Sequence, residues 1–205
     1  MSISSTHARQ APKLSSRELS QKTWPDFERL FQTRPAPGAY ACWCMHHHRL
    51  GPVSKRPSDS HASMVERNHQ EQKALVESGS SHGVLVYAGG EPVGWCQFGL
   101  RQELPRMDRD PKYRELTKGD GAKQLWRITC FVVRHRYRGF GVASTALRAA
   151  LVAIKKRGGG LVEAYPVRHW SAYARYRGTV SMFKKEGFEV ISPLGASNLL
   201  MRRAV

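Results

Sequence analysis

Acidic side chains are scarce in this chain. Its 205 residues include 16 Asp and Glu against 33 Lys and Arg, which gives a formal net charge of +17. A field of this strength attracts polyanions, so a nucleic acid or a ribosome is one candidate partner. No nucleic-acid-binding fold signature accompanies the charge, and we therefore do not favour nucleic-acid binding as the primary role.

Long apolar runs are also missing. None is long enough to cross a bilayer, and the first 22 residues lack the apolar segment of a secretory signal. These residues are rich in Ser and Gln without apolar periodicity, which predicts a disordered basic tail over residues 1–22. The remainder, residues 23–205, suits a single globular domain. We expect a cytoplasmic protein that does not bind membranes.

Cysteine is sparse, and nothing in the sequence suggests export. The four cysteines all lie in predicted strands, so we expect reduced core thiols. Three histidines, 46–48, follow two of them, and thiolates and imidazoles are the ligands that zinc prefers. However, alternate strand residues share one face, Cys-x-Cys is not the usual zinc spacing, and no second ligand cluster is visible. We predict no metal and exposed histidines. The cysteines are Cys42, Cys44, Cys96 and Cys130.

The most informative segment is 125–157, in which an apolar strand leads through a basic, glycine-containing turn into an amphipathic helix. Gly139 and Gly141 tolerate positive φ, so their neighbouring amides can converge on one oxyanion. From Val142, apolar residues recur every three or four positions as far as the three glycines at 158–160. The unpaired first-turn amides of such a helix attract anions, so the segment predicts a phosphate site.

This turn differs from two other nucleotide-binding motifs. A dinucleotide site would use an acid roughly 20 residues further on, where Glu163 lies. However, Ser144 replaces the third glycine, the basic residues 134–138 separate the strand from the glycines, and too little chain follows for a second nucleotide-binding half. A kinase-type phosphate loop is excluded because no Gly-Lys-Ser/Thr follows the turn.

The pattern Arg136-x-x-Gly139-x-Gly141, between a strand and a helix, resembles the acyl-CoA signature of the GNAT superfamily of N-acyltransferases. The resemblance covers roughly residues 39–203, and motif, order and spacing agree. It implies an α/β (α+β) fold with a mixed central sheet of about seven strands, splayed at the CoA strand and flanked by helices. The matching elements are a glycine-turn hairpin at 83–98, a strand at 161–166, a helix at 178–188 ending in Gly-Phe, and apolar runs at 188–191 and 199–201.

The resemblance also implies how acetyl-CoA, the expected acyl donor, is bound. The pantetheine arm pairs with the backbone of Phe131, Val132 and Val133, and an N–H near Phe131 stabilises the oxyanion of the attacked thioester. Apolar side chains suffice in that role, because only the backbone acts. The residues implied for the phosphates are Arg136, Arg138, Gly139, Phe140, Gly141, Val142 and Ala143.

Amine acetylation requires a neutral amine, because an amine with a pKa near 10.4 is mostly protonated at neutral pH. The strand 126–133 holds no carboxylate, so we predict Glu163, on the adjacent strand, as the catalytic base. Many relatives carry a tyrosine in the last helix that protonates the CoA sulfur, but Phe183 stands there in this chain. Either another hydroxyl protonates the sulfur, with Tyr165, Tyr173 and Tyr176 as candidates, or the CoA thiolate leaves without enzymic protonation, since a thiol is a much better acid than an amine.

Acceptor specificity is expected from segments outside the common frame. Residues 24–31 predict a short amphipathic helix, and 38–45 predict the first strand. Residues 101–123 form a polar insertion whose prolines and glycines exclude one continuous helix. Among the acids of the insertion, the candidates for binding a cationic amine are Asp108, Asp110 and Glu115.

Three functions therefore stay open. We favour an acetyl-CoA-dependent N-acetyltransferase that acts on an unidentified amine, either a small molecule or a protein. The alternatives are a catalytically degenerate acyl-CoA sensor or partner module, and a basic nucleic-acid or ribosome binder on the same fold. Exposed strand edges allow a monomer or a homodimer.

Overall fold

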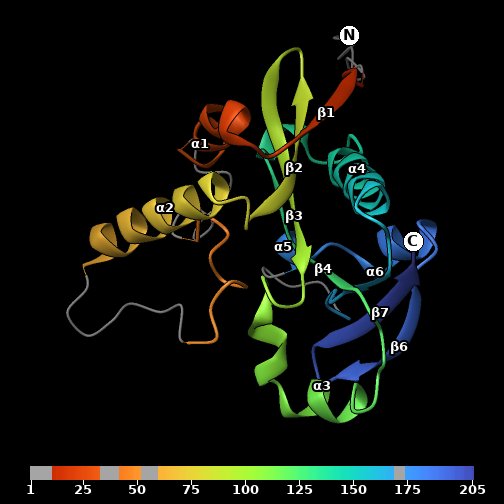
Figure 1. Cartoon of the computed structure of the whole chain (residues 1–205). Coiled ribbons are helices and arrows are strands. Elements are labelled where there is room, and N and C mark those ends of the chain that lie inside the picture. The colour runs from red at the N-terminus through yellow and green to blue at the C-terminus, as the bar shows by residue number, and fades with distance from the viewer. Residues whose placement is uncertain (1–10, 33–41, 52–59, 169–173) are drawn as a thin grey trace, which may run out of the picture.

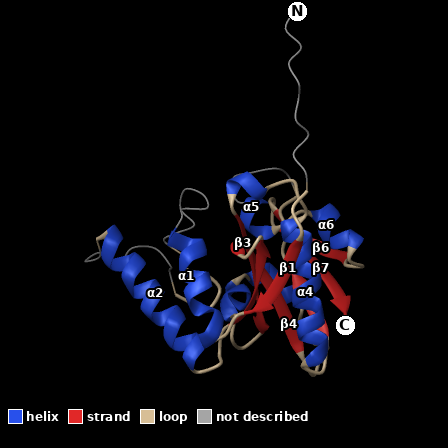
Figure 2. Cartoon of the chain, turned by 90° about the horizontal axis from the view of Figure 1, so that it is seen from above, coloured by secondary structure: helices blue, strands red, loops and turns tan. Residues whose placement is uncertain are grey.

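The computed structural model of the chain describes residues 11–32, 42–51, 60–168 and 174–205, which form one mixed sheet with helices on both faces (Figures 1 and 2). The elements in chain order are β1 (Leu14–Glu18), η1 (Gln21–Thr23), α1 (Trp24–Gln32), α2 (His61–Glu77), β2 (His82–Ala88), β3 (Glu91–Leu100), η2 (Pro105–Arg109), α3 (Pro111–Leu116), β4 (Leu125–Val133), η3 (His135–Tyr137), α4 (Val142–Lys156), β5 (Leu161–Ala164), α5 (Ala174–Arg177), α6 (Val180–Lys185), β6 (Glu189–Leu194) and β7 (Asn198–Ala204).

The sheet has seven strands in the order β1-β2-β3-β4-β5-β7-β6. Its neighbouring strands are antiparallel except for β4 and β5, which run parallel. Helices α1 and α2 lie on one face, and α4 lies on the other (Figures 1 and 2). The predicted fold class, a mixed sheet of about seven strands flanked by helices, is confirmed.

Strands β2 and β3 form the predicted hairpin, between the edge strand β1 and the central strand β4. Gly89 and Gly90 connect them with φ values of 57° and 83°, the left-handed pair that a tight hairpin turn requires. Both strands are buried along most of their length, because helices cover both faces of the sheet. The hairpin therefore forms a rigid base for the neighbouring strand β4.

The larger core lies between the sheet and α4, the helix predicted from Val142 onwards. Leu147 and Ile154 of this helix are fully buried and pack in the same cluster as Val86 and Phe98 of the hairpin. Their spacing along the helix places them on one face, as the apolar periodicity predicted. This packing fixes the position of the helix N-terminus relative to the sheet.

An aromatic core covers the opposite face under α1, which confirms the amphipathic helix predicted at residues 24–31. Phe27 packs edge to face on Trp95 with ring centroids 4.9 Å apart, and Phe31 stacks on Trp43 at 5.7 Å. Because all four rings are buried, α1 is part of the folding unit.

The N-terminal segment differs from the sequence-based expectation. Leu14–Glu18 forms β1 and pairs antiparallel with β2, so the prediction of a disordered tail up to residue 22 is wrong from residue 14 onwards. The side chains of this segment are mostly polar and gave no strand pattern in the sequence. The strand forms because its backbone groups pair with those of β2, and composition does not reveal such pairing. Residues 1–10 lie outside the described residues.

The first strand predicted at 38–45 is also not found. Residues 42–48 form successive turns, with φ of 38° at Trp43 and 60° at Cys44. Positive φ is incompatible with a strand, and β1 takes the sheet edge instead. Residues 38–41 lie outside the described residues. All four cysteines are free thiols, two in β3 and β4 as predicted and two in this turn.

The insertion at 101–123 contains two short helices, η2 and α3, which meet at Asp110. The Asp110 carboxylate accepts hydrogen bonds from the amides of Lys112 (2.8 Å) and Tyr113 (3.1 Å), and Pro111 occupies the first position of α3. The expectation that no single helix spans this insertion is confirmed.

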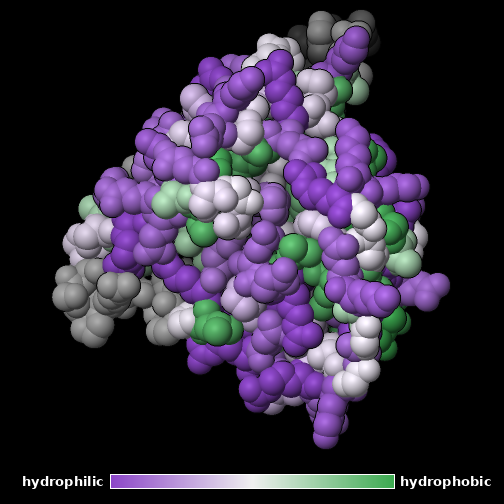
Figure 3. All heavy atoms as spheres, viewed as in Figure 1, coloured by the Kyte–Doolittle hydropathy of each residue, from purple (hydrophilic) through white to green (hydrophobic). Residues whose placement is uncertain are grey.

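Hydrophilic side chains cover most of the face shown in Figure 3. Among the helices of the described residues, none has the length and apolar character needed to span a membrane.

Candidate functional site

Strands β4 and β5 separate partway along their length. They pair only from Leu125–Leu161 to Ile128–Ala164, whereas β4 continues through Val133 alongside β3. Residues 129–133 therefore have a strand on one side only. This is the splay predicted at the CoA strand, and it leaves a backbone edge that an extended ligand can pair with.

A β-bulge lies where the separation begins. Gln97 pairs with Cys130, but the next pair is Phe98 with Ile128, so Thr129 is an extra residue in β4. The Thr129 hydroxyl donates to Oε1 of Gln97 at 2.9 Å, and both side chains are buried. The bulge thus changes the direction of β4 at the splay.

The glycines of the turn after β4 adopt the positive φ expected from the sequence. Gly139 and Gly141 have φ values of 85° and 76°, and a Cβ on either would meet no atom within 4 Å. Helix α4 begins directly afterwards, with its first hydrogen bond from the Thr145 amide to the Gly141 carbonyl at 2.9 Å. The amides of residues 142–144 consequently lack intrahelical acceptors and lie at the positive end of the helix dipole.

The predicted donor-binding residues follow one another along this path. Phe131 and Val132 are buried in the cores on opposite faces, which leaves only their backbone for a ligand. Val142 is buried beneath the helix start, and Ala143 packs partly against the same core. A groove beside the turn is lined by Pro12, Ala88, Gly89, Glu91, Arg136, Tyr137 and Phe140.

The cations near the turn are already engaged. Glu91, in the hairpin, forms ion pairs with Arg136 and with Arg134, the latter at 3.5 Å. The guanidinium of Arg136 lies 5.0 Å from the ring centroid of Tyr137. A bound phosphate would therefore compete with Glu91 for the Arg136 guanidinium.

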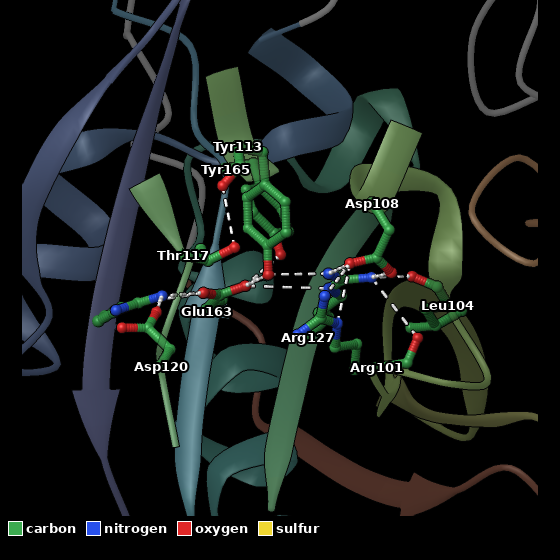
Figure 4. Close-up of polar contacts among 10 residues, drawn as sticks. Arg101, Leu104, Asp108, Tyr113, Thr117, Asp120, Arg127, Glu163 and Tyr165 are labelled. Atoms are coloured by element: carbon green, nitrogen blue, oxygen red, sulfur yellow. Dashed lines mark hydrogen bonds and ion pairs between the residues drawn. The ribbon is translucent and has the colours of Figure 1, made fainter. Parts of the chain in front are cut away.

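Glu163 and Tyr165 belong to a buried polar network (Figure 4). In the sheet, Glu163 lies between Arg127 of β4 and Arg202 of β7. Its Oε1 accepts from Arg202 Nη2 at 2.8 Å, and its Oε2 accepts from the hydroxyls of Tyr113 at 2.8 Å and Tyr165 at 2.6 Å. The carboxylate is fully buried, so its hydrogen-bonding capacity is used inside the protein.

Arg127 connects this network to the insertion (Figure 4). It donates two hydrogen bonds of 2.9 Å to Asp108 and one of 2.7 Å to the Leu104 carbonyl. Burial by itself would raise the pKa of Asp108. The hydrogen bonds and the positive charge of Arg127 have the larger combined effect, so the pKa of Asp108 lies below its usual value. Asp108, considered above as a site for a cationic amine, is thus neutralised internally. A lone arginine in an apolar strand was the sequence signal for such a network, since a buried charge needs partners.

The tyrosines differ in their environments. Burial raises the pKa of Tyr165 well above its usual value; the positive charge of Arg127 opposes this rise, and Glu163 adds to it. Tyr176 is partly buried and packs against the aromatic core, and Tyr173 lies outside the described residues. Phe183 is fully buried between Phe131 at 6.0 Å and Phe188 at 5.1 Å, so an apolar contact fills the position where relatives carry a hydroxyl.

The histidine turn packs on the sheet face beside the bulge, contrary to the exposed histidines expected from sequence. His47 is only 4% exposed, and burial lowers the pKa of His46 and of His48 to about 4 each. His48 Nε2 lies 3.1 Å from Nε2 of Gln97. Across the described ranges, no three or more His, Cys, Asp or Glu side chains are grouped so that they could hold a metal ion.

Comparison with known proteins places this architecture in a family. Residues 51–179, more than half of the chain, match the model of the acetyltransferase (GNAT) family. The chain belongs to this family. A search of curated proteins gave no match.

Solved structures share the fold. An acetyltransferase from Thermus thermophilus is 16% identical with a TM-score of 0.52, covering 95% of this chain and 99% of that chain. The paia N-acetyltransferase from Thermoplasma acidophilum in complex with coenzyme A is 14% identical with a TM-score of 0.52, and the match covers 94% of this chain and 99% of that chain. A ribosomal-protein-alanine N-acetyltransferase from Brucella melitensis is 14% identical with a TM-score of 0.53, and the match covers 93% of this chain and 99% of that chain.

Proposed function

We propose that the protein is an acetyl-CoA-dependent N-acetyltransferase that transfers an acetyl group to a primary amine by direct attack on the thioester. The supporting observation is continuity: the one-sided edge of β4 at residues 129–133 leads through Gly139 and Gly141 to the N-terminus of α4. An extended thiol ester with a diphosphate at one end fits that sequence of sites. The solved structure from Thermoplasma acidophilum, which has the same fold, contains coenzyme A.

In this proposal the donor is held mainly by backbone groups. The pantetheine arm pairs with residues 131–133, and the diphosphate accepts hydrogen bonds from the amides of residues 139–143. Arg136 and Arg138 add positive charge beside the turn. The acetyl group then lies at the bulge, where β4 and β5 separate.

The reaction follows from that placement. The amine lone pair attacks the thioester carbonyl carbon, an N–H near Phe131 stabilises the resulting oxyanion, and the tetrahedral adduct collapses with loss of CoA thiolate. The nitrogen releases one proton, and the thiolate takes one up. Because a thiol is a far stronger acid than an amine, the thiolate can leave without an enzymic acid.

Glu163 and Tyr165, our sequence-based catalytic candidates, are better supported as positioning residues. Glu163 is enclosed by Arg202, Tyr113 and Tyr165, and reaching an amine would break these bonds. Tyr165 donates to Glu163, and its raised pKa makes it a poor proton donor to a thiolate. We infer that they hold β5 in place beside the splay, and that the enzyme binds the acceptor as the neutral amine.

A calorimetric titration with acetyl-CoA at physiological salt tests the donor site. Gly141→Asp places a carboxylate in the cradle and should abolish binding. The matched control is Gly119→Asp, because Gly119 also has positive φ (87°) and open space but lies in the insertion. Equal acetyl-CoA affinity in wild type and Gly141→Asp, or no binding by wild type, would contradict the proposal.

A second function, an acyl-CoA sensor without turnover, is favoured by the buried phenyl ring of Phe183 and the enclosed Glu163. A broad amine panel separates the two functions. Acetyl-CoA binding with every amine inert identifies the sensor, whereas amine-dependent CoA release above hydrolysis identifies the transferase.

A further inference from the structure

A cluster of two histidines and two arginines lies beside the bulge and has no part in donor binding. It comprises His46 and His47 of the turn, Arg106 of η2 and Arg177 of α5. The imidazole rings of His46 and His47 are 4.9 Å apart, and the Arg106 amide donates to the His47 carbonyl at 3.3 Å. Helix α5 packs against β4, which brings Arg177 beside Cys130. Three separate segments thus bring basic residues together beside the splay, and Arg106 Nη1 also donates to the Gly51 carbonyl at 3.0 Å.

Arg177 is half-buried, and the groups that act on it are Cys130, Arg106 and Tyr165. Burial lowers its pKa, so the guanidinium is held at a cost in solvation. No carboxylate pairs with it in the described ranges, and the masked ranges contain a single acid, Asp59. A half-buried guanidinium without a counterion suits an anionic ligand.

His47 gives an independent indication. Its side chain is 4% exposed, and its Nδ1 has no hydrogen-bond partner. Such atoms are rare inside folded proteins and call for a partner. The charges of Arg177 and Arg106 reach this ring, so the unpartnered nitrogen belongs to the same cluster. An anion placed there would also favour a protonated His47, which would then donate to it.

The nearby acids cannot supply the missing charge, because each is committed elsewhere. Glu103 accepts from the Leu100 amide at 2.7 Å and contacts His82 Nε2 at 3.1 Å. Asp108 is bound by Arg127 and Arg101, and Glu163 by Arg202 and two tyrosines. The titratable groups that otherwise act on the cluster are Arg109, Cys42, Cys130, Tyr165 and His48.

We infer that the acceptor is an amine that also carries a carboxylate, which pairs with Arg177 and Arg106 while its amino group faces the thioester at the bulge. This inference rests on the proposed function and names its substrate class. The phosphate cradle lies at the far end of residues 130–134, about 13 Å further along the strand at 3.3 Å per residue, so donor and acceptor anions occupy separate sites. Two guanidinium groups also repel a second amine, which disfavours diamines.

The test compares initial rates for matched amines: glycine with glycinamide, β-alanine with β-alaninamide, γ-aminobutyrate with putrescine, and the common amino acids with their amides. The amino group of an α-amino amide is less basic than that of the free amino acid, so a larger fraction of it is neutral at a given pH. Intrinsic reactivity alone would therefore give the amide the higher rate. Higher kcat/KM for the carboxylated member therefore supports the inference. Turnover confined to amides and diamines, or none with any carboxylated amine while acetyl-CoA still binds, overturns it.

Variants assign the effect to the cluster. Arg177→Met should raise KM for carboxylated acceptors by about tenfold, with KM for acetyl-CoA unchanged, and Arg177→Lys should recover part of the loss. The control is Arg114→Met, in α3 and exposed, which should behave as wild type. An unchanged acceptor KM in Arg177→Met, with normal thermal unfolding, contradicts the assignment. If the wild-type protein does not bind acetyl-CoA, the proposed function itself is refuted.

Discussion

Val142, the first residue of α4, occupies the space that a side chain at Gly94 would need. A Cβ on Gly94 would lie 2.3 Å from Cγ1 of Val142, and Gly94 is paired with Val133 at the end of the CoA strand. The helix can approach the sheet this closely only because residue 94 has no side chain. This contact brings the first-turn amides next to the end of β4.

Gly94→Ala should therefore displace the start of α4, destabilise the fold by about 1–3 kcal/mol and weaken acetyl-CoA binding. Gly94→Ala combined with Val142→Ala removes the clash and should recover part of both losses. Urea unfolding and calorimetry measure the two effects. Gly121→Ala, where a Cβ meets nothing within 4 Å, is the control. Normal donor affinity in Gly94→Ala would show that this contact does not position the cradle.

Glu163→Gln should lower stability by about 3–5 kcal/mol, because it removes the charge between buried Arg127 and half-buried Arg202, which keep only Asp108 and Asp120 as acidic partners. The folded variant should keep the pH dependence of kcat. Denaturant titration and pH–rate profiles separate these outcomes. Glu115→Gln, at an exposed ion pair with Lys112, should change stability by less than about 0.5 kcal/mol. Loss of the basic limb of kcat in a stable Glu163→Gln protein would restore Glu163 as the base.

Glu91→Gln should strengthen acetyl-CoA binding at low salt, because it releases Arg134 and Arg136 for the phosphates. The gain should be a few-fold and should disappear as salt screens the exposed charges. Titrations at two ionic strengths measure it. Glu77→Gln, at the distant end of α2, is a control without this effect. Weaker donor binding in Glu91→Gln would mean that the ion pairs orient the arginines productively.

Stability should fall as the pH decreases from 6.5 to about 4. Burial lowers the pKa of His46 and His48 from 6.5 to about 4, so in this window the unfolded chain binds more protons than the folded chain. Each histidine then contributes a slope of about 1.4 kcal/mol per pH unit. The stability associated with these two histidines is therefore fully present above pH 6.5 and is lost as the pH falls towards 4.

Urea unfolding at several pH values tests this dependence. His48→Gln should reduce the slope between pH 6.5 and 4, and His61→Asn, at an exposed position, should leave it unchanged. An identical slope in His48→Gln would show that His48 is not held neutral in the folded state.

Local patterns predicted the frame of the site correctly. The apolar strand at 125–133, the glycines at 139 and 141 and the helix from Val142 are read from side-chain periodicity and from the conformational freedom of glycine, which act over a few residues. The hairpin, the helix at 24–31 and the break in the insertion at Pro111 follow from the same short-range rules.

Features that depend on distant partners were missed. Strand β1 is stabilised by backbone pairing with β2, and the left-handed turn at Trp43 and Cys44 is held by the aromatic core above the sheet. Both needed tertiary contacts that override local preference.

The sequence by itself determined the frame of the proposed donor site, because the strand, the glycine turn and the helix start that compose it are contiguous and locally encoded. Only the tertiary structure decided what surrounds the reacting centre. It enclosed Glu163 between Arg127 and Arg202, and it gathered His47 and Arg177 from separate segments beside the bulge. Burial and long-range charge set the roles of these side chains, and neither is visible before the chain folds.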